Sequence, residues 1–246
     1  EIGVRLVGSE MCIRDRFKID KGDHLLDTHT HILWNIDDGS KNQCMSLQML
    51  EIAARSGTKA IFATPHVIER ANKPSWEEIK EKTQQLRQLC AEAQIDIMLY
   101  PGAEVQMNWE LLPELGAAGA YCLNGGRYLL VELPAAEIPA YADEFWYELE
   151  LKGITPILAH PERYQQLREN PDLLLLWRRR GMLMQCNSGS FTGMFGSSVC
   201  ENAKVLLANG LVDLLGSDGH RSEGRNTDMS LSLIHISEPT RRTPIS

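Results

Sequence analysis

The sequence predicts an α/β fold in which parallel strands form a barrel, and three observations carry this prediction. Short apolar runs alternate with longer helical stretches along most of the 246 residues, a pattern typical of a parallel sheet. About seven such units favour a closed or nearly closed barrel, with an open doubly wound sheet as the alternative. A barrel typically needs about 250 residues, so the length suits one barrel, although two small domains would also fit.

The candidate strands are short, apolar and often bounded by glycine or proline. They are Leu25–Asp27, Ala60–Thr64, Ile97–Tyr100, Tyr128–Leu133, Thr155–Ala159, Met182–Cys186 and Leu211–Leu215.

The stretches between them have helical patterns, and most end at a glycine, the usual residue just past a helix. They are Cys44–Ser56, Ser75–Ala93, Pro139–Lys152, Pro171–Arg180 and Ser198–Asn209. Ser75 with Glu78 three residues later is a capping box, which places a helix start at Ser75.

Charge and composition exclude several classes of protein. The formal net charge is −8 and the pI is near 5.4, which argues against a nucleic-acid partner because phosphate-backbone binding needs a basic face. The sequence has no apolar run of the roughly 18 to 20 residues that span a bilayer and no signal peptide. We therefore expect a soluble, cytoplasmic protein without a membrane span.

The two ends of the chain differ from its middle. Residues 1–16 and 231–246 have no clear period and resemble translated sequencing-adaptor read-through, so we exclude both from fold reasoning. The expected functional domain is residues 17–230, and the natural C-terminus is expected to be lost near Ser230.

Histidines and acids gather near the ends of the candidate strands. The histidines are His29, His31, His66, His160 and His220, and the acids are Asp27, Asp37, Asp38, Glu104, Glu132 and Asp218. In an α/β barrel the carboxyl ends of the strands meet at one mouth, so these side chains can converge there. Taken singly, each histidine would also fit a structural role in the core or a loop.

The spacing of these residues favours a metal centre. His29 and His31 are two apart, which on an extended segment places both rings on one face, and Asp218 and His220 repeat that spacing. His160 precedes Pro161, and proline biases the residue before it towards extended backbone. The candidates offer only nitrogen and oxygen, a set that suits Mn, Fe or Zn in a hydrolytic site. They outnumber the ligands of one ion, which predicts two or three ions.

At this point the motifs carry a resemblance. DTHTHIL, IDDGS, ATPH, GAEV, LLVELP, AHPERY and GSDGH followed by GR occur in this order from about His24 to Arg225. They resemble the PHP (polymerase and histidinol phosphatase) superfamily, and more closely its bacterial manganese-dependent protein-tyrosine phosphatases of capsule and exopolysaccharide synthesis. The resemblance implies a distorted (β/α)7 TIM-like barrel with three metal ions at its mouth. The chain departs from the family after Arg225, so a C-terminal closing helix is expected to be missing.

The resemblance also implies roles for individual residues. One Mn²⁺ would be held by His29, His31, Glu104 and Asp218, a second by Glu104, Glu132 and His160, and a third by Asp38, His66 and His220. Arg163 and Arg225 match the family's phosphate-binding arginines, and a guanidinium group fits phosphate oxygens well. The implied reaction is hydrolysis of phosphotyrosine by metal-bridged hydroxide attack on phosphorus. The implied partner is the phosphotyrosine tail of a bacterial tyrosine kinase; no oligomeric state or general acid is predicted.

Alternatives remain open at the level of sequence. Another PHP phosphoesterase, of the histidinol-phosphate type, is the nearest, and a non-catalytic metal-binding regulatory module is a second. An amidohydrolase would usually carry a lysine at a middle strand end, which none of these strands has. A cysteine-dependent phosphatase is disfavoured because none of the six cysteines has an arginine six positions later.

Overall fold

The structure is a computed structural model that describes residues 25–230. The predictions for the two tails and for a missing closing helix fall on residues outside this range. Within residues 25–230, no helix has both the length and the apolar composition of a membrane-spanning segment.

All strands of the two sheets pair in parallel. The first sheet has the order β1 (Leu25–Thr30), β2 (Thr58–Ala63), β4 (Met98–Pro101). The second has the order β3 (His66–Val67), β5 (Glu104–Gln106), β6 (Tyr128–Glu132), β7 (Thr155–Ala159), β8 (Leu183–Asn187), β9 (Leu214–Gly216).

Two positions in the barrel are each occupied by a pair of consecutive short strands, one in the first sheet and one in the second. β2 pairs with β4, and β3 pairs with β5, so β2 and β3 together act as one interrupted strand, and so do β4 and β5. Pro65 lies in the first break and lacks the N–H that a ladder needs. Gly102 lies in the second, where a Cβ atom would be 2.7 Å from Leu123 Cδ2. The nine strands therefore occupy seven positions around the barrel, the number that the sequence predicts.

The ring of strands is closed between its last and first members. The segment after β9 pairs in parallel with β1 through a bridge between Thr30 and Gly219. The His31 N–H donates to the Gly219 carbonyl at 2.9 Å, and the Asp218 N–H donates to the His29 carbonyl at 2.7 Å. This pairing confirms a distorted barrel and excludes the open sheet.

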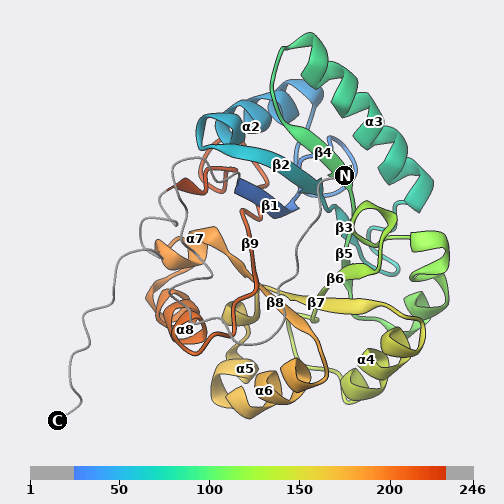
Figure 1. The fold of residues 1–246 in the computed structure, drawn as a ribbon, viewed down its shortest axis with the longest axis vertical. Coiled ribbons are helices and arrows are strands. Elements are labelled where there is room, and N and C mark those ends of the chain that lie inside the picture. The colour runs from blue at the N-terminus through green and yellow to red at the C-terminus, as the bar shows by residue number, and fades with distance from the viewer. Residues whose placement is uncertain (1–24, 231–246) are drawn as a thin grey trace.

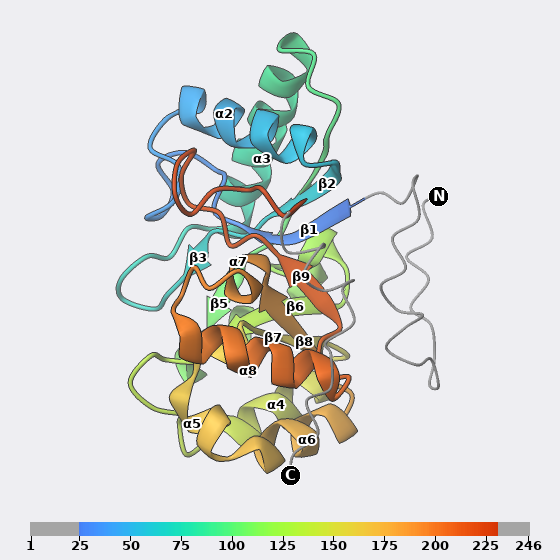
Figure 2. The same ribbon diagram turned by 90° about the vertical axis from the view of Figure 1, so that its left-hand side faces the viewer.

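Helices cover the outside of the strands (Figures 1 and 2). They are α2 (Gln43–Arg55), α3 (Trp76–Glu92), α4 (Ala142–Leu151), α5 (Gln165–Glu169), α6 (Pro171–Arg179), α7 (Ser188–Phe191) and α8 (Ser197–Ala208). The 3-10 helices are η1 (Trp109–Glu114), η2 (Ala117–Gly119), η3 (Leu123–Gly125) and η4 (Pro161–Arg163). Figure 2 shows α2 and α3 on the side of β1 and β2, and α4, α5, α6 and α8 on the side of β6 to β9.

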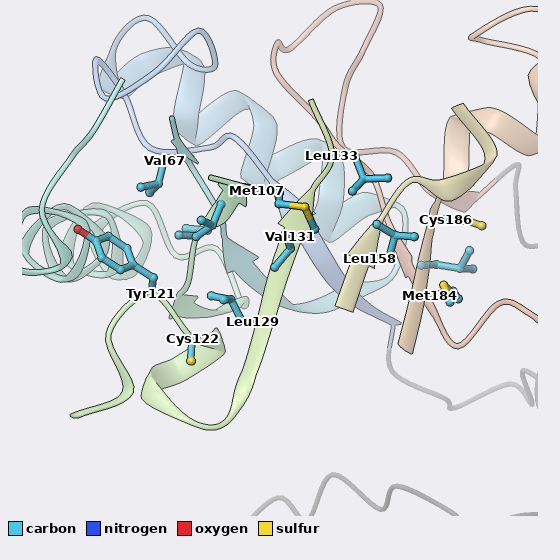
Figure 3. Packing of buried hydrophobic residues seen from close by; sticks show 14 of the residues in the cluster. Val67, Met107, Tyr121, Cys122, Leu129, Val131, Leu133, Leu158, Met184 and Cys186 are labelled. Atoms are coloured by element: carbon cyan, nitrogen blue, oxygen red, sulfur yellow. The ribbon is translucent and has the colours of Figure 1, made fainter. Parts of the chain in front are cut away.

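Alternation along the strands separates two apolar layers. Leu129 and Val131 of β6 belong to the large cluster that packs under the helices, part of which Figure 3 shows. Leu130, between them, belongs with Ile157 and Ala159 of β7 to a smaller cluster. Partly buried side chains from both sheets pack on the smaller cluster, which therefore fills the barrel interior below the mouth.

Each predicted strand and helix is present, with differences at the ends. Ser75 caps α3 as predicted, since its Oγ accepts the Glu78 N–H at 3.1 Å. β9 begins at Leu214, three residues after the predicted Leu211. Leu211 and Val212 are buried but belong to the connection from α8, because an apolar run indicates burial and does not by itself indicate a ladder.

Candidate metal centre

The mouth of the barrel brings together all nine predicted metal ligands. They come from β1 and the loop after it, from β3, β5 and β6, and from the segments after β7 and β9; they are His29, His31, Asp38, His66, Glu104, Glu132, His160, Asp218 and His220. Seven of them supply ligand atoms to three overlapping groups, each compact enough to hold a cation. The other two lie beside these groups, His160 Nε2 at 2.8 Å from Glu104 Oε1 and Asp218 Oδ1 at 3.4 Å from His31 Nε2.

The first group is fully buried and lies around His29 and His31. The two Nε2 atoms are 3.1 Å apart, as the alternation of side chains along β1 predicts. Glu104 Oε2 lies 3.1 Å from His29 Nε2 and 3.3 Å from His31 Nε2. Asp218 Oδ1 lies 3.6 and 3.4 Å from the same two nitrogens. Two ligands of one transition-metal ion are about 2.9 to 3.4 Å apart, given metal–ligand bonds near 2.1 Å, so this spacing fits a shared ion.

The second group lies around Glu104 and Glu132. His160 Nε2 is 2.8 Å from Glu104 Oε1 and 4.0 Å from Glu132 Oε2. His66 Nδ1 is 3.0 Å from Glu104 Oε2 and 3.3 Å from Glu132 Oε1. Glu104 therefore lies between the first two groups, which is where a bridging carboxylate belongs.

The third group is more open to solvent. Asp38 Oδ1 lies 3.4 Å from His220 Nε2 and 3.7 Å from His66 Nε2. The Asp38 side chain is 66% exposed, whereas that of Asp218 is 1% exposed. His66 has one ring nitrogen towards the second group and the other towards the third, whereas the resemblance implies a role in the third alone.

The chemistry of these donors fits divalent cations. Asp218 Oδ1 and His66 Nδ1 are buried and have no hydrogen-bond partner among the described residues. A buried polar atom without a partner costs free energy unless a ligand satisfies it. Imidazole nitrogen and carboxylate oxygen are suitable ligands for Mn, Fe and Zn.

The electrostatics of the centre are those of carboxylates balanced by cationic groups. Burial by itself would raise the pKa of Glu104, but the charges on His29 and His66 hold that pKa well below its usual range. Burial opposes the charged form of His66, yet Glu104 raises the pKa of His66 to about 10. Divalent cations would balance the same carboxylates, so metal and protons are expected to compete here.

Two of the predicted metal ligands have left-handed backbone. Asp218 has φ 53°, and His160 has φ 37° and ψ 54°. The prediction that Pro161 keeps His160 extended is therefore wrong. Pro161 is instead the first residue of η4, and the His160 N–H donates to the Gln185 carbonyl at 2.8 Å. The resulting turn directs the His160 ring towards Glu104, and left-handed residues of this kind are often found at functional sites.

Asp37, adjacent to the predicted ligand Asp38, supports the centre from behind. Its Oδ2 lies 2.7 Å from His31 Nδ1 and accepts the His66 N–H at 2.9 Å. Its Oδ1 accepts the Gly39 N–H at 2.8 Å. Asp37 thus leaves His31 Nε2 facing the centre, the usual function of a carboxylate behind a metal-binding histidine.

Two amide side chains at the end of β8 were not identified from the sequence. Gln185 Oε1 lies 3.0 Å from His29 Nδ1, and Asn187 Nδ2 donates to Asp218 Oδ2 at 2.6 Å. Both are buried. The only signal was their position, since polar residues that close an apolar strand lie at the mouth of a barrel.

The two predicted phosphate-binding arginines lie side by side at the edge of the centre. Arg163 Nη1 donates to Asp218 Oδ2 at 3.1 Å, and Arg225 Nη2 donates to the same oxygen. Phe195 lies under both, with its ring centroid 4.9 Å from Arg163 Cζ and 5.4 Å from Arg225 Cζ. The arginines therefore form one cationic edge that faces the metal-binding groups.

Three of the cysteines in the described part of the chain are poor candidates for a nucleophile. Cys90, Cys122 and Cys186 are buried, and burial raises the pKa of Cys122 to about 11. A thiol with such a pKa stays protonated at neutral pH and is a poor nucleophile.

Comparisons with known proteins agree with this site. The sequence profile of the family described as "Capsular polysaccharide synthesis, CpsB/CapC" matches residues 25–241. The chain is 34% identical over 202 residues to the tyrosine-protein phosphatase YwqE of Bacillus subtilis (strain 168), covering 82% of this chain and 80% of that protein. It is 28% identical over 206 residues to the tyrosine-protein phosphatase CpsB of Streptococcus pneumoniae, covering 82% and 85%.

Solved structures show the same fold. A crystal structure described as one of YwqE and CpsB, "unique metal-dependent tyrosine phosphatases", superposes with a TM-score of 0.81 at 32% identity, covering 86% of this chain and 85% of that chain. A histidinol phosphate phosphatase of Lactococcus lactis superposes with a TM-score of 0.55 at 17% identity, covering 86% and 92%, and so shares the fold. The predicted fold and family are therefore confirmed. This chain belongs to the CpsB/CapC family of capsular polysaccharide synthesis proteins.

Proposed function

We propose that this protein is a metal-dependent protein-tyrosine phosphatase that acts on a phosphotyrosine tail of a bacterial tyrosine kinase in the cytoplasm. The observation that carries the proposal is the arrangement at the mouth, where three overlapping groups of possible metal-ligand atoms lie beside Asp218, to which two arginines donate. The names of the relatives support the reaction and the family name supports the capsule context.

The proposed metal ligands are those of the three groups, and the proposed ions are two or three Mn²⁺, with Fe or Zn as alternatives. Such cations lower the pKa of water and neutralise charge on phosphoryl oxygens. Glu104 would be a ligand common to the first two groups, because its Oε2 lies near His29 and His31 and its Oε1 lies near His160. Asp37 and Gln185 would hold His31 and His29 in the orientation that metal binding needs.

Arg163 and Arg225 would bind the phosphoryl oxygens that the cations do not. Their side chains are 34% and 30% exposed, so they can reach a ligand at the mouth. A tyrosyl leaving group has a phenol pKa of about 10, so it departs with less help from a general acid than an alkyl alcohol needs.

The test is phosphate release from a phosphotyrosyl peptide by the purified full chain. Protein stripped with a chelator should lose activity and regain it with Mn²⁺, and parallel samples with Fe²⁺ and Zn²⁺ would rank the metals. Histidinol phosphate serves as the competing substrate. Faster turnover of histidinol phosphate would favour the alternative phosphoesterase, and metal binding without turnover of either would favour a regulatory module.

The proposed domain is residues 17–230. A chain trimmed to this range should keep the melting temperature, the Mn²⁺ content and the activity of the full chain. A marked fall in any of the three would contradict this boundary.

A further inference from the structure

One buried carboxyl group beside the metal centre belongs to none of the three metal-binding groups. Glu162 lies between Pro161 and Arg163 in η4 and is 0% exposed. Its Oε2 has no hydrogen-bond partner among the described residues. A buried carboxyl group that is only partly satisfied costs free energy. A residue kept at such a cost is often one that function requires.

The other carboxyl oxygen of Glu162, Oε1, joins η4 to the corner between β8 and α7. It accepts the main-chain N–H of Asn187 at 2.9 Å and the hydroxyl of Ser190 at 2.7 Å. Asn187 is the last residue of β8, and Ser190 lies in α7. The main-chain carbonyl of Glu162 accepts Asn202 Nδ2 of α8 at 3.0 Å. Glu162 therefore fixes η4 against three other elements of the fold.

Both sides of this link continue to the phosphate-binding arginines. On one side, Arg163 is the next residue after Glu162. On the other side, Asn187 Nδ2 donates to Asp218 Oδ2 at 2.6 Å. Arg163 Nη1 donates to the same oxygen at 3.1 Å, and Arg225 Nη2 also donates to it. These contacts form a closed ring that returns to Glu162 along the chain, and both guanidinium groups are attached to this ring.

We propose that Glu162 is a positioning residue for the two phosphate-binding arginines and acts as a hydrogen-bond acceptor. The inference rests on the proposed function and deepens it, because it names the residue that holds η4 and the end of β8 together. Loss of the acceptor leaves the Asn187 N–H and the Ser190 hydroxyl, both buried, without their partner. η4 and the end of β8 then separate, and the arginines no longer meet at one carboxylate oxygen.

Metal binding depends less on this link than phosphate binding does. His160 is held through its own N–H, which donates to the Gln185 carbonyl at 2.8 Å. Asp218 is held through its own N–H, which donates to the His29 carbonyl at 2.7 Å. Variants of Glu162 should therefore keep their Mn²⁺ and lose affinity for phosphate, a separation that a merely structural residue would not show.

The first test measures the affinity of the Mn²⁺-loaded full chain for inorganic phosphate by isothermal titration, which needs no turnover. Glu162→Met keeps the length of the side chain and removes the acceptor, so phosphate affinity should fall about tenfold while the Mn²⁺ content stays unchanged. Glu162→Gln retains an acceptor oxygen and should bind phosphate within about threefold of the wild-type affinity. Glu201→Met, at an exposed position of α8, is the matched control and should change neither quantity.

Three results of this titration would overturn the inference. They are an unchanged phosphate affinity in Glu162→Met, equal losses in Glu162→Met and Glu162→Gln, and a loss of Mn²⁺ from Glu162→Met that matches its loss of phosphate affinity. A wild-type chain that binds phosphate but releases none from a phosphotyrosyl peptide would count against the proposed function alone. A wild-type chain that does not bind phosphate would overturn both.

The second test uses Ser190→Ala, which removes one of the two donors to Oε1 and leaves Glu162 in place. Phosphate affinity should fall about threefold at unchanged Mn²⁺ content. If Glu162→Met does not fold, this variant decides alone, and an unchanged phosphate affinity would overturn the inference.

A third measurement separates binding from chemistry in Glu162→Met. With a phosphotyrosyl peptide, KM should rise about tenfold while kcat changes less than about threefold, because the arginines hold the phosphoryl group and the metal ligands are retained. A fall in kcat at unchanged KM would contradict a positioning role through the arginines.

Discussion

The layer under the helices and the mouth of the barrel are both buried, but they are built on opposite principles. In the layer under the helices, the ring centroids of Trp177 and Trp146 are 5.6 Å apart in an edge-to-face arrangement. The indole N–H of Trp177 donates to Asp143 Oδ1 at 2.9 Å. At the mouth, Glu104 and Asp218 are 1% exposed and are surrounded by histidines. Apolar packing stabilises the first region, whereas in the second, carboxylates and imidazoles converge at a cost in desolvation.

This difference teaches where stability and chemistry are located. Buried charge is retained where it binds something, because a well-packed apolar substitute would often be at least as stable. We therefore expect substitutions in the helix-facing layer to lower stability and leave metal binding intact, and substitutions at the mouth to do the reverse.

The largest effect should follow from Glu104→Gln. Glu104 contacts His29, His31, His66 and His160, so losing its charge removes the carboxylate common to the first two groups. Phosphotyrosyl hydrolysis should fall at least about 1,000-fold, and Mn²⁺ should no longer raise the melting temperature.

The matched control is Glu110→Gln. Glu110 is paired with Arg70 at the surface, and its loss should leave both readouts unchanged. A Glu104→Gln protein that kept its Mn²⁺ content would break the assignment of this residue as a shared ligand.

Trp177→Ala tests the opposite region. The side chain is 1% exposed, so its truncation should lower the free energy of unfolding by about 3 to 5 kcal/mol, measured by urea denaturation. Leu151→Ala, at a position 62% exposed, should change it by no more than about 0.5 kcal/mol. Loss of Mn²⁺ affinity in folded Trp177→Ala would contradict the separation of the two regions.

Asp37→Asn should give an intermediate effect at the mouth. The variant keeps the size of the side chain but loses the charge beside His31 Nδ1. Substitution of such a supporting group typically costs about 10- to 100-fold in metal affinity, which isothermal titration with Mn²⁺ would measure. Asp96→Asn, at a surface ion pair with Lys59, should not change the affinity; if Asp37→Asn were equally silent, Asp37 would have no role in orienting His31.

The elements of the fold could be predicted because each is coded locally. Apolar runs, terminal glycines and the Ser75 cap mark the strands and helices directly. The sequence shows a proline at position 65 and a glycine at position 102, where the strands are interrupted. It does not predict β3 and β5, because strands of two and three residues are too short to show an alternating pattern. Their existence depends on pairing with each other and with β6, which is a property of the closed barrel.

In the candidate site, too, some residues could be predicted from the sequence and others depend on the folded barrel. Histidines and acids at strand ends could be found, because their chemistry is specific and a barrel brings those ends together. Spacing could not decide what Asp37 does beside Asp38, since the two side chains differ only in the direction that the loop gives them. Gln185 and Asn187 were missed because an amide has no chemical signature, and its role follows from the register of β8 with β7 and β9.

The smallest effect concerns Phe195, at the edge of the mouth. Its ring lies against both Arg163 and Arg225, so an apolar contact holds the cationic edge of the mouth. A cation–π contact contributes about 0.5 to 2 kcal/mol, so Phe195→Leu should weaken inhibition by inorganic phosphate about three- to tenfold. Phe195→Tyr keeps the ring and should restore most of the affinity, and Met194→Leu, at the exposed neighbour, should have no effect. An unchanged phosphate inhibition constant in Phe195→Leu would show that Asp218 alone positions the two arginines.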